Sequence, residues 1–212
     1  GSGNVTLTIN NEIATNYSIT YNLDGGTNNE GNPTTYTINS PTITLLNASK
    51  SGYQFVGWYT EPTGGTKVES ITSGSTGNKV LYARWLAELT VTLDYNDGKT
   101  PSSSFVVIEG NSYGINLPTP EREGYTFVGW YTNLEGGTKK TSTDIVTNSH
   151  TLYARWAGVS YTLNINSSYI SVKRGTEVLS NGAAIYKDDV LTITYSRNGY
   201  DSATILANGV AL

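Results

Sequence analysis

Residues 52–60 read Gly-Tyr-Gln-Phe-Val-Gly-Trp-Tyr-Thr, and residues 124–132 repeat the phrase as Gly-Tyr-Thr-Phe-Val-Gly-Trp-Tyr-Thr. A second phrase, Leu-Tyr-Ala-Arg-Trp, closes each copy at 81–85 and at 152–156. The chain is therefore a tandem array, and a chain that copies a small module more often builds length, valency or a binding surface than an active site. Positions that are identical in both copies are those that the module cannot easily vary.

The composition limits the size and the class of the protein. At 212 residues the chain has room for one large or two to three small domains, and the repeat favours three small ones. Cysteine is absent, which excludes a disulfide, a thiolate nucleophile and a Cys-based metal site. Methionine is absent too, and the start at Gly1-Ser2-Gly3 leads us to expect a vector-derived leader on a fragment of a longer protein.

Charge and hydropathy narrow the choice of partners. Charged residues make up 14% of the chain, the net charge is −4, and no basic block is present, so nucleic acid and anionic membranes are poor partners. No segment resembles a signal peptide or a membrane span, so we expect any such segment of the parent protein to lie outside this fragment. We expect a monomer, with a host protein or a glycan as the candidate partner.

Alternation of apolar and polar residues predicts the first strands of each copy. Residues 17–23 and 89–95 alternate at every position, which is the period of a half-buried strand. Each stretch runs into a turn rich in Asp, Asn and Gly, so a hairpin is predicted, with return strands near 34–38 and 104–108. The 16 tyrosines and 23 glycines also favour a β-protein with many tight turns.

The second half of each copy carries the repeated phrases. Two prolines within 116–123 exclude a regular helix there, whereas 45–51 has no proline and is compatible with one helical turn. A third strand is predicted over Phe-Val-Gly-Trp-Tyr, a reversal at Gly-Gly-Thr-Lys, and a last strand over Leu-Tyr-Ala-Arg-Trp. Residues 86–88 and 157–158 are expected to be short linkers.

The pattern changes from about residue 157 onward. Alternating stretches such as 190–195 predict further strands, but both tryptophan phrases are missing, so 157–212 is expected to be a distinct small all-β module. Residues 6–13 resemble 204–211, because each is an apolar strand pattern that ends in an asparagine turn. Our hypothesis is that residues 4–14 form the last strand of an upstream module.

Several phrases in the same order, found twice, resemble the Listeria–Bacteroides repeat, also called the internalin B-repeat. The resemblance covers residues 17–85 and 89–156. It implies a compact β-grasp-like module that occurs in strings on bacterial surface proteins, with roles in display and adhesion rather than catalysis, and it implies no catalytic residues. The first copy departs from the pattern at 47–50, where Asn-Ala-Ser-Lys replaces Pro-x-Pro-x-Arg.

Large aromatic residues dominate the repeated signature. Trp58 and Trp130 suit either the core of a small module or a platform that stacks on sugars, and we prefer the core. Trp85 and Trp156 end a strand and are candidates for sealing the module boundary. The signature positions are Gly52, Tyr53, Phe55, Gly57, Trp58, Tyr59, Trp85, Gly124, Tyr125, Phe127, Gly129, Trp130, Tyr131 and Trp156.

Charged and polar candidates favour structural roles. Arg84 and Arg155 are compatible with an anion site, but we prefer a guanidinium that stacks on an aromatic ring or pairs with a carboxylate, Asp24 in the first copy. Residues 94–98 resemble a calcium loop only loosely and are interpreted as a hairpin turn. His150, the single histidine, lies in a predicted variable loop and is a poor candidate for a dyad or a zinc site.

These observations predict a mainly β chain, α+β at most. The expected domains are a leading segment at 1–16, repeat modules at 17–85 and 89–156, and a small β-module at 157–212. We expect no enzyme, catalytic residue, cofactor or metal site, and an extracellular location on a bacterial cell surface. The expected role is a spacer or an adhesive display of modules, with carbohydrate or host-protein binding as the alternative. A ligand site is expected where the copies differ, in the loops at 27–33 and 99–104, in the loops at 69–79 and 140–150, and in the C-terminal module.

Overall fold

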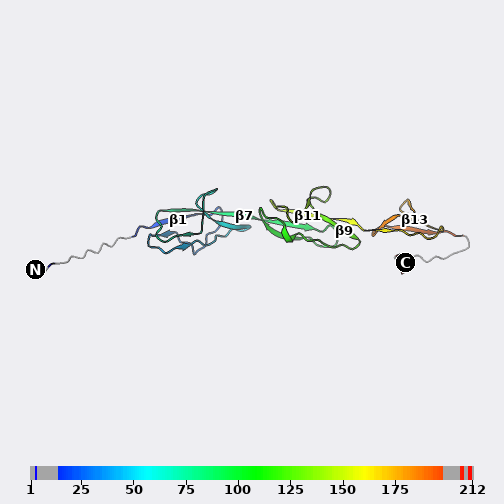
Figure 1. The fold of residues 1–212 in the computed structure, drawn as a ribbon, viewed down its shortest axis with the longest axis horizontal. Coiled ribbons are helices and arrows are strands. Elements are labelled where there is room, and N and C mark those ends of the chain that lie inside the picture. Colours follow the sequence, from blue (N-terminus) through cyan, green and yellow to red (C-terminus); the bar gives the residue numbers. More distant parts are fainter. Residues whose placement is uncertain (1–2, 4–13, 198–205, 208–209, 212) are drawn as a thin grey trace. The chain divides into compact units, whose positions relative to one another are not determined.

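The computed structural model describes residues 3, 14–197, 206–207 and 210–211. Nearly all of the regular structure in these residues is strand, so the expected mainly β class is confirmed (Figure 1). The 3₁₀ turn η1 (Gly114–Asn116) is the single helical element in the described part. No described helix has the length and apolarity needed to cross a membrane. The upstream strand hypothesised over residues 4–14 lies, except for Ala14, outside the described residues.

The chain divides into two compact units. The first comprises residues 1–92, 104–116 and 142–150, and the second comprises 93–103, 117–141 and 151–212. The first unit holds the sheet of the first copy, whose β1 runs parallel to β7 while its other neighbouring strands are antiparallel. In the order in which they lie, its strands are β2 (Thr35–Tyr36), β1 (Tyr17–Asn22), β7 (Lys79–Asp94), β4 (Tyr53–Tyr59) and β5 (Lys67–Val68).

Smaller strands complete the first unit. β3 (Ile43–Thr44) pairs with β6 (Ser70–Ile71), and β8 (Ser103–Ile108) pairs with β7. The predicted hairpins are confirmed, because β2 returns along β1 and β8 returns along β7. No α-helix is present in the described residues, so the β-grasp likeness stays a prediction.

The second unit repeats the third and last strands of the module and adds the C-terminal strands. β9 (Tyr125–Tyr131) lies between β10 (Lys139–Lys140) and β11 (His150–Gly158), antiparallel to both. The C-terminal part forms separate small sheets of antiparallel strands. Their strands are β12 (Ser160–Thr162), β13 (Ile170–Arg174), β14 (Glu177–Leu179), β15 (Ala184–Tyr186), β16 (Leu191–Tyr195), β17 (Leu206–Ala207) and β18 (Val210–Ala211).

The structure corrects three local expectations. The linkers expected at 86–88 and 157–158 are both strand, because β7 continues to Asp94 and β11 continues to Gly158. The helical turn considered for 45–51 does not form; Leu45 N–H donates instead to the Glu69 carbonyl, in continuation of the β3–β6 pair. His150 is the first residue of β11 rather than part of a loop.

The core of the first copy forms where the inward-facing residues of its strands meet. Ile19 of β1, Trp58 of β4 and Leu81 of β7 are each at most 4% exposed. In the second copy Trp130 and Leu152 are buried in the same way. Burial of a few large side chains matters in a module this small, because small domains hide a modest share of their surface.

A glycine places a bulge in the third strand of each copy. Gly57 has φ 151° and Gly129 has φ 150°, a conformation that side chains with a Cβ rarely adopt. The pairing of β4 with β7 shifts register between Phe55 and Gly57. A Cβ on either glycine would meet the aliphatic chain of a lysine, Lys67 or Lys139, which lies across the bulge. The glycine of the repeated phrase is therefore required by local geometry.

Candidate functional site

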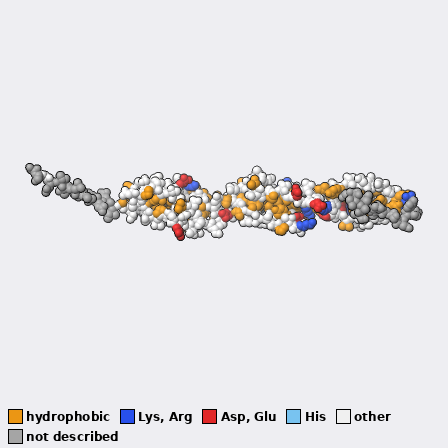
Figure 2. Space-filling view, turned by 90° about the horizontal axis from the view of Figure 1, so that it is seen from below, with side chains coloured by type: hydrophobic (Ala, Val, Ile, Leu, Met, Phe, Trp, Pro, Cys, Tyr) orange, Lys and Arg blue, Asp and Glu red, His pale blue; other side chains and the backbone are white. Residues whose placement is uncertain are grey.

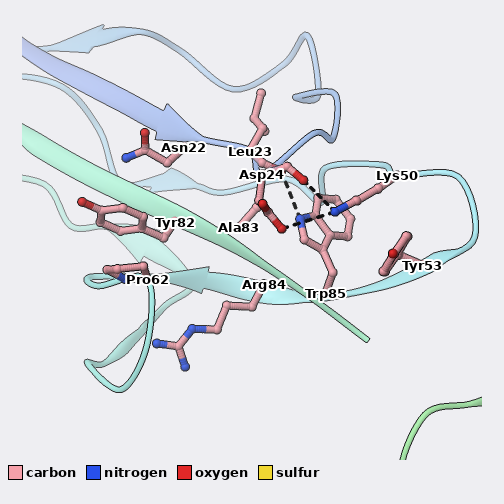
Figure 3. Close-up of a pocket in the computed structure, with 10 residues that line it drawn as sticks. All are labelled: Asn22, Leu23, Asp24, Lys50, Tyr53, Pro62, Tyr82, Ala83, Arg84 and Trp85. Carbon is pink, nitrogen blue, oxygen red and sulfur yellow. Dashed lines mark hydrogen bonds and ion pairs between the residues drawn. The ribbon is translucent and has the colours of Figure 1, made fainter. Parts of the chain in front are cut away.

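An open groove of about 770 Å³ lies in the first copy where β1 ends beside β7 (Figure 3). β1 pairs with β7 as far as Asn22 and Tyr82, and the chain then turns away at Asp24, which has φ 47°. β7 continues past this point, and its residues 83–85 line the groove. The lining residues are Asn22, Leu23, Asp24, Lys50, Tyr53, Pro62, Tyr82, Ala83, Arg84 and Trp85.

One end of the groove is organised around a lysine. Lys50 Nζ lies 2.6 Å from the Asp24 carbonyl oxygen and 3.3 Å from its carboxylate. The same ammonium lies 4.3 Å from the ring centre of Tyr53 and 5.9 Å from that of Trp85. Trp85 in turn donates its indole N–H to the Leu23 carbonyl at 3.1 Å, which fixes the turn to the last strand. Figure 3 draws the two contacts of Lys50 with Asp24 and the bond from Trp85 to Leu23.

The second copy places a cation beside the same aromatic pair, although the cation comes from a different residue. Arg122 takes the place of the lysine, with its guanidinium 3.9 Å from the Tyr125 ring centre and 6.0 Å from that of Trp156. Trp156 donates to the Tyr95 carbonyl at 2.8 Å. The departure of the first copy from Pro-x-Pro-x-Arg therefore preserves the cation over the aromatic pair, although it changes the residue that carries it.

The two copies differ at the residue that turns away from the sheet. In the second copy Asn96, with φ 47°, donates its side-chain amide to the Ala154 carbonyl of β11 at 3.3 Å. The first copy has Asp24 at this place and Ala83 in the equivalent strand position. A carboxylate has no N–H to donate. The bond that covers the strand edge in the second copy is thus impossible in the first.

The repeated tryptophans Trp58 and Trp130 are core residues and belong to no surface site. Each is 2% exposed. Trp58 donates its indole N–H to the Leu46 carbonyl at 2.9 Å, and Trp130 donates to the Pro118 carbonyl at 2.7 Å. A buried indole needs such a partner for its polar atom. Trp85 and Trp156 are half-buried and pack edge-on against Phe55 and Phe127 of their own copies.

The repeated arginines stack on tyrosines. Arg84 lies 3.7 Å from the Tyr59 ring centre and donates to the carbonyls of Glu61 and Gly64. The stacking role predicted for Arg84 is confirmed, whereas the suggested pairing with Asp24 is wrong, because Asp24 pairs with Lys50 instead.

Arg155 repeats the arrangement on Tyr131, 3.9 Å from the ring centre, and donates to the carbonyls of Asn133 and Gly136. A planar guanidinium can stack and reach two carbonyls at once, which a lysine cannot do. The arginine therefore fastens the loop after the third strand to the last strand.

Replacing Arg84 with lysine should lower the free energy of unfolding by about 1–2 kcal/mol, because the loop carbonyls lose their donors and the ring its planar partner. Arg122→Lys is the matched control, since Lys50 fills that corner in the first copy, and it should cost less than about 0.5 kcal/mol. Urea denaturation of the two variants measures the difference. Equal losses in both would show that the Arg84 geometry contributes nothing special.

The remaining sequence candidates have structural partners. Asp97 accepts hydrogen bonds from Lys99 N–H, Thr100 N–H and Thr100 Oγ1, which lower its pKa to about 2, so its carboxylate serves the turn. His150 Nε2 lies 2.7 Å from Tyr113 Oη, and its Nδ1 lies 2.7 Å from the Asn148 carbonyl. Among the described residues, no group of three His, Cys, Asp or Glu is placed to hold a metal ion.

Within the second unit, the turn that opens the repeated phrase contacts residues of the C-terminal segment. Tyr125 Oη donates to the Asp188 carboxylate, which raises the pKa of Tyr125, and Lys187 Nζ lies 3.0 Å from Glu123. The Lys187 side chain crosses Gly124 so closely that a Cβ there would meet it. The first copy has Ser51 where the second has Glu123, so it lacks the carboxylate of this ion pair.

Tyr21 makes the first copy sensitive to alkaline pH. Burial raises the pKa of Tyr21 from 10.0 to about 12, and its hydroxyl donates to the Pro33 carbonyl at 2.9 Å. Above about pH 10 the unfolded chain loses a proton that the folded chain keeps, so the contribution of Tyr21 is complete below pH 10 and is lost as the pH rises to about 12.

We therefore expect Tyr21→Phe to flatten the fall of unfolding free energy with pH in this window. Urea denaturation at a series of alkaline pH values measures that slope. The slope below about pH 10 is the internal control, because Tyr21 is protonated there in both states and the substitution should leave it unchanged. An unchanged slope in the Tyr21 variant would show that the ring ionises alike in both states.

The repeated modules, with their bulged third strand and arginine-fastened loop, define a β-strand repeat protein. The chain belongs to the Listeria–Bacteroides repeat family, whose model matches residues 17–84 and 90–155, more than half of the chain.

Three relatives are bacterial proteins. Internalin H of Listeria monocytogenes is 31% identical over 62% of this chain and 23% of its own length. A protein of Evansella cellulosilytica provisionally named a membrane protein is 31% identical over 71% of this chain and 23% of that protein. A second protein of that organism, provisionally named a Gly-rich membrane protein, is 32% identical over 72% of this chain and 17% of that protein. The chain thus spans a quarter or less of the length of these relatives.

Proposed function

We propose that this chain is part of the non-enzymatic repeat region of an extracellular bacterial surface protein, where it acts as a spacer or as an adhesive display of modules. The proposed modules are residues 17–85, 89–156 and 157–212. Membership of the Listeria–Bacteroides repeat family and similarity to internalin H support a surface protein.

The observation that carries this proposal is that the residues shared by both copies have structural roles within their own copy. Trp58 and Trp130 are buried, and Arg84 and Arg155 fasten a loop of their own copy. The glycines of the repeated phrase accommodate a bulge. What has been copied is therefore a set of folding requirements, as in repeat proteins that build length from similar units. A duplicated catalytic site would instead keep acids, bases or nucleophiles in both copies.

The surface is compatible with such a role. On the face drawn in Figure 2, charged side chains are few, and backbone and uncharged polar side chains take up much of the surface. Repeated modules can present weak sites at fixed spacing, and simultaneous contacts then raise the overall affinity without any strong single site.

Location is tested on intact cells of the source bacterium. Antibodies raised against this chain should label unbroken cells, and brief protease treatment should remove the signal. Labelling that occurs only after lysis would overturn the proposal.

The two roles are separated by replacing the repeats in the full-length protein with an unrelated folded insert of equal length. A spacer role predicts that a distal epitope stays accessible to antibody and that adhesion to host cells is retained. Loss of adhesion with the epitope still accessible would favour adhesion through the repeats themselves. Unchanged accessibility after simple deletion of the repeats would exclude the spacer.

A second candidate function is carbohydrate or host-protein binding. The groove of the first copy favours the carbohydrate form of this alternative, because aromatic rings and short polar side chains line it together.

A further inference from the structure

The groove of the first copy is lined by polar residues that differ from those at the equivalent place in the second copy. Its position where β1 leaves β7 is set by the fold, and its size falls in the range of about 300–1,000 Å³ that is typical of ligand sites. In the second copy the Asn96 amide covers the carbonyl of Ala154. In the first copy Asp24 turns to Lys50, and Ala83 lines the groove.

Both cations of the groove already have hydrogen-bond acceptors within the chain. Lys50 contacts the carboxylate and the carbonyl of Asp24, and Arg84 donates to the carbonyls of Glu61 and Gly64. An anionic ligand would have to displace one of these internal partners. Because Lys50 is held by Asp24 and Arg84 by two loop carbonyls, the groove suits an uncharged ligand better than an anion.

The remaining lining groups combine ring faces with short polar side chains. Tyr82 and Tyr53 are aromatic, and Tyr53 is 41% exposed. Asn22 is exposed and carries both a donor and an acceptor, and the Asp24 carboxylate, 80% exposed, has acceptor positions beyond its bond to Lys50. Figure 3 shows Asn22 and Tyr82 toward one end of the groove and Lys50 and Tyr53 toward the other.

We propose that this groove binds a neutral saccharide. A sugar ring presents C–H groups that pack on the face of Tyr82, and hydroxyls that donate to the Asp24 carboxylate and the Ala83 carbonyl and exchange hydrogen bonds with the Asn22 amide. The proposal goes beyond the display role, which holds with or without a ligand in the groove.

An extended peptide is the weaker alternative. Strand addition gains affinity from a run of backbone hydrogen bonds along an open edge. Here the edge that lines the groove comprises only residues 83–85, and alternate residues of a strand point their backbone groups to opposite sides. A peptide would therefore form few such bonds.

The test is an amide NMR titration of the full chain with the methyl glycosides of glucose, mannose, galactose and N-acetylglucosamine, each up to tens of millimolar. The expected result is a saturable shift of the Asn22 side-chain amide and of the backbone amides of residues 83–85 with at least one sugar. The equivalent amides of the second copy, at 154–156, should not move, and they serve as the internal control.

Three variants assign the binding to the groove. Asp24→Asn should weaken the affinity at least tenfold, because the new amide can cover the Ala83 carbonyl as Asn96 covers Ala154; the fold should tolerate it, since Asn96 has the same φ of 47°. Tyr82→Ala should weaken it similarly, whereas the matched Tyr153→Ala in the second copy should leave it unchanged.

Several outcomes would overturn the proposal. They are no shift with any of the four sugars, shifts that are equal in both copies, or affinity that survives both groove substitutions in variants with native amide spectra. Shifts of the same amides by an extended polar peptide, with none by the sugars, would assign the groove to strand addition. Failure of this test would leave the proposed surface location and spacer role intact, because those are measured on cells.

Discussion

Replacing Trp130 with alanine should lower the free energy of unfolding by about 3–5 kcal/mol, the usual cost of truncating a large buried aromatic residue. The indole is 2% exposed, and its ring centre lies 5.5 Å from those of both Tyr95 and Phe127 in edge-on geometry. Its N–H donates to the Pro118 carbonyl at 2.7 Å. Because small domains are stable by about 5–15 kcal/mol in total, this single change should remove much of the stability of the second copy.

Denaturant unfolding followed by amide NMR measures this loss separately in each copy. Leu134→Ala is the control, because Leu134 is 53% exposed and truncation of its side chain should cost less than about 0.5 kcal/mol. Trp58→Ala should produce the same large effect in the first copy. Unchanged unfolding of the second copy in the Trp130 variant would contradict its place in the core and would restore the case for a surface aromatic platform.

Much of the strand pattern could be predicted from the sequence, including one feature that we interpreted wrongly. From Leu81 to Leu93 every odd-numbered residue is apolar, and all of them are buried or half-buried in β7. The alternation does not pause at 86–88, so a continuous strand could have been predicted there. The repeated phrase ends at Trp85, which suggested a module boundary there. The alternation of apolar and polar side chains is what predicts a strand, and it continues past Trp85.

The partners of polar side chains could not be predicted in the same way. Nothing in the spacing of Asp24 and Lys50 shows that they meet, and Arg84 is held by loop carbonyls that every sequence possesses. The groove lies where β1 stops pairing with β7. That position depends on the tertiary fold, so it could not be predicted from the local sequence. Comparison of the copies does supply one usable signal, namely the exchange of Asp24 for Asn96.

Replacing Asn32 with alanine should cost about 1–3 kcal/mol, because it leaves a backbone group of Leu46 without its partner. Asn32 is 6% exposed. Its side-chain oxygen accepts from Leu46 N–H at 2.7 Å, and its amide donates to the Leu46 carbonyl at 2.9 Å and to Asn28 Oδ1 at 2.8 Å. Asn39→Ala is the control, since Asn39 is exposed, and it should be close to neutral. Denaturant unfolding of the first copy measures both variants.

The second copy shows how the loss of Asn32 can be compensated. Pro118 stands where the first copy has Leu46, since each accepts the indole N–H of the tryptophan twelve residues later. Proline has no N–H, so the second copy needs no asparagine to satisfy one. Leu46→Pro should therefore lower the free energy of unfolding when Asn32 is present, because the Asn32 side-chain oxygen loses its N–H donor. In the Asn32→Ala background the same substitution should cost about 1 kcal/mol less. A double-mutant cycle of these two positions measures that coupling. If the losses of the two single variants simply add in the double variant, the hydrogen bond between Asn32 and Leu46 N–H does not explain the difference between the copies. That difference is the proline of the second copy at the place where the first copy has a leucine bonded to asparagine.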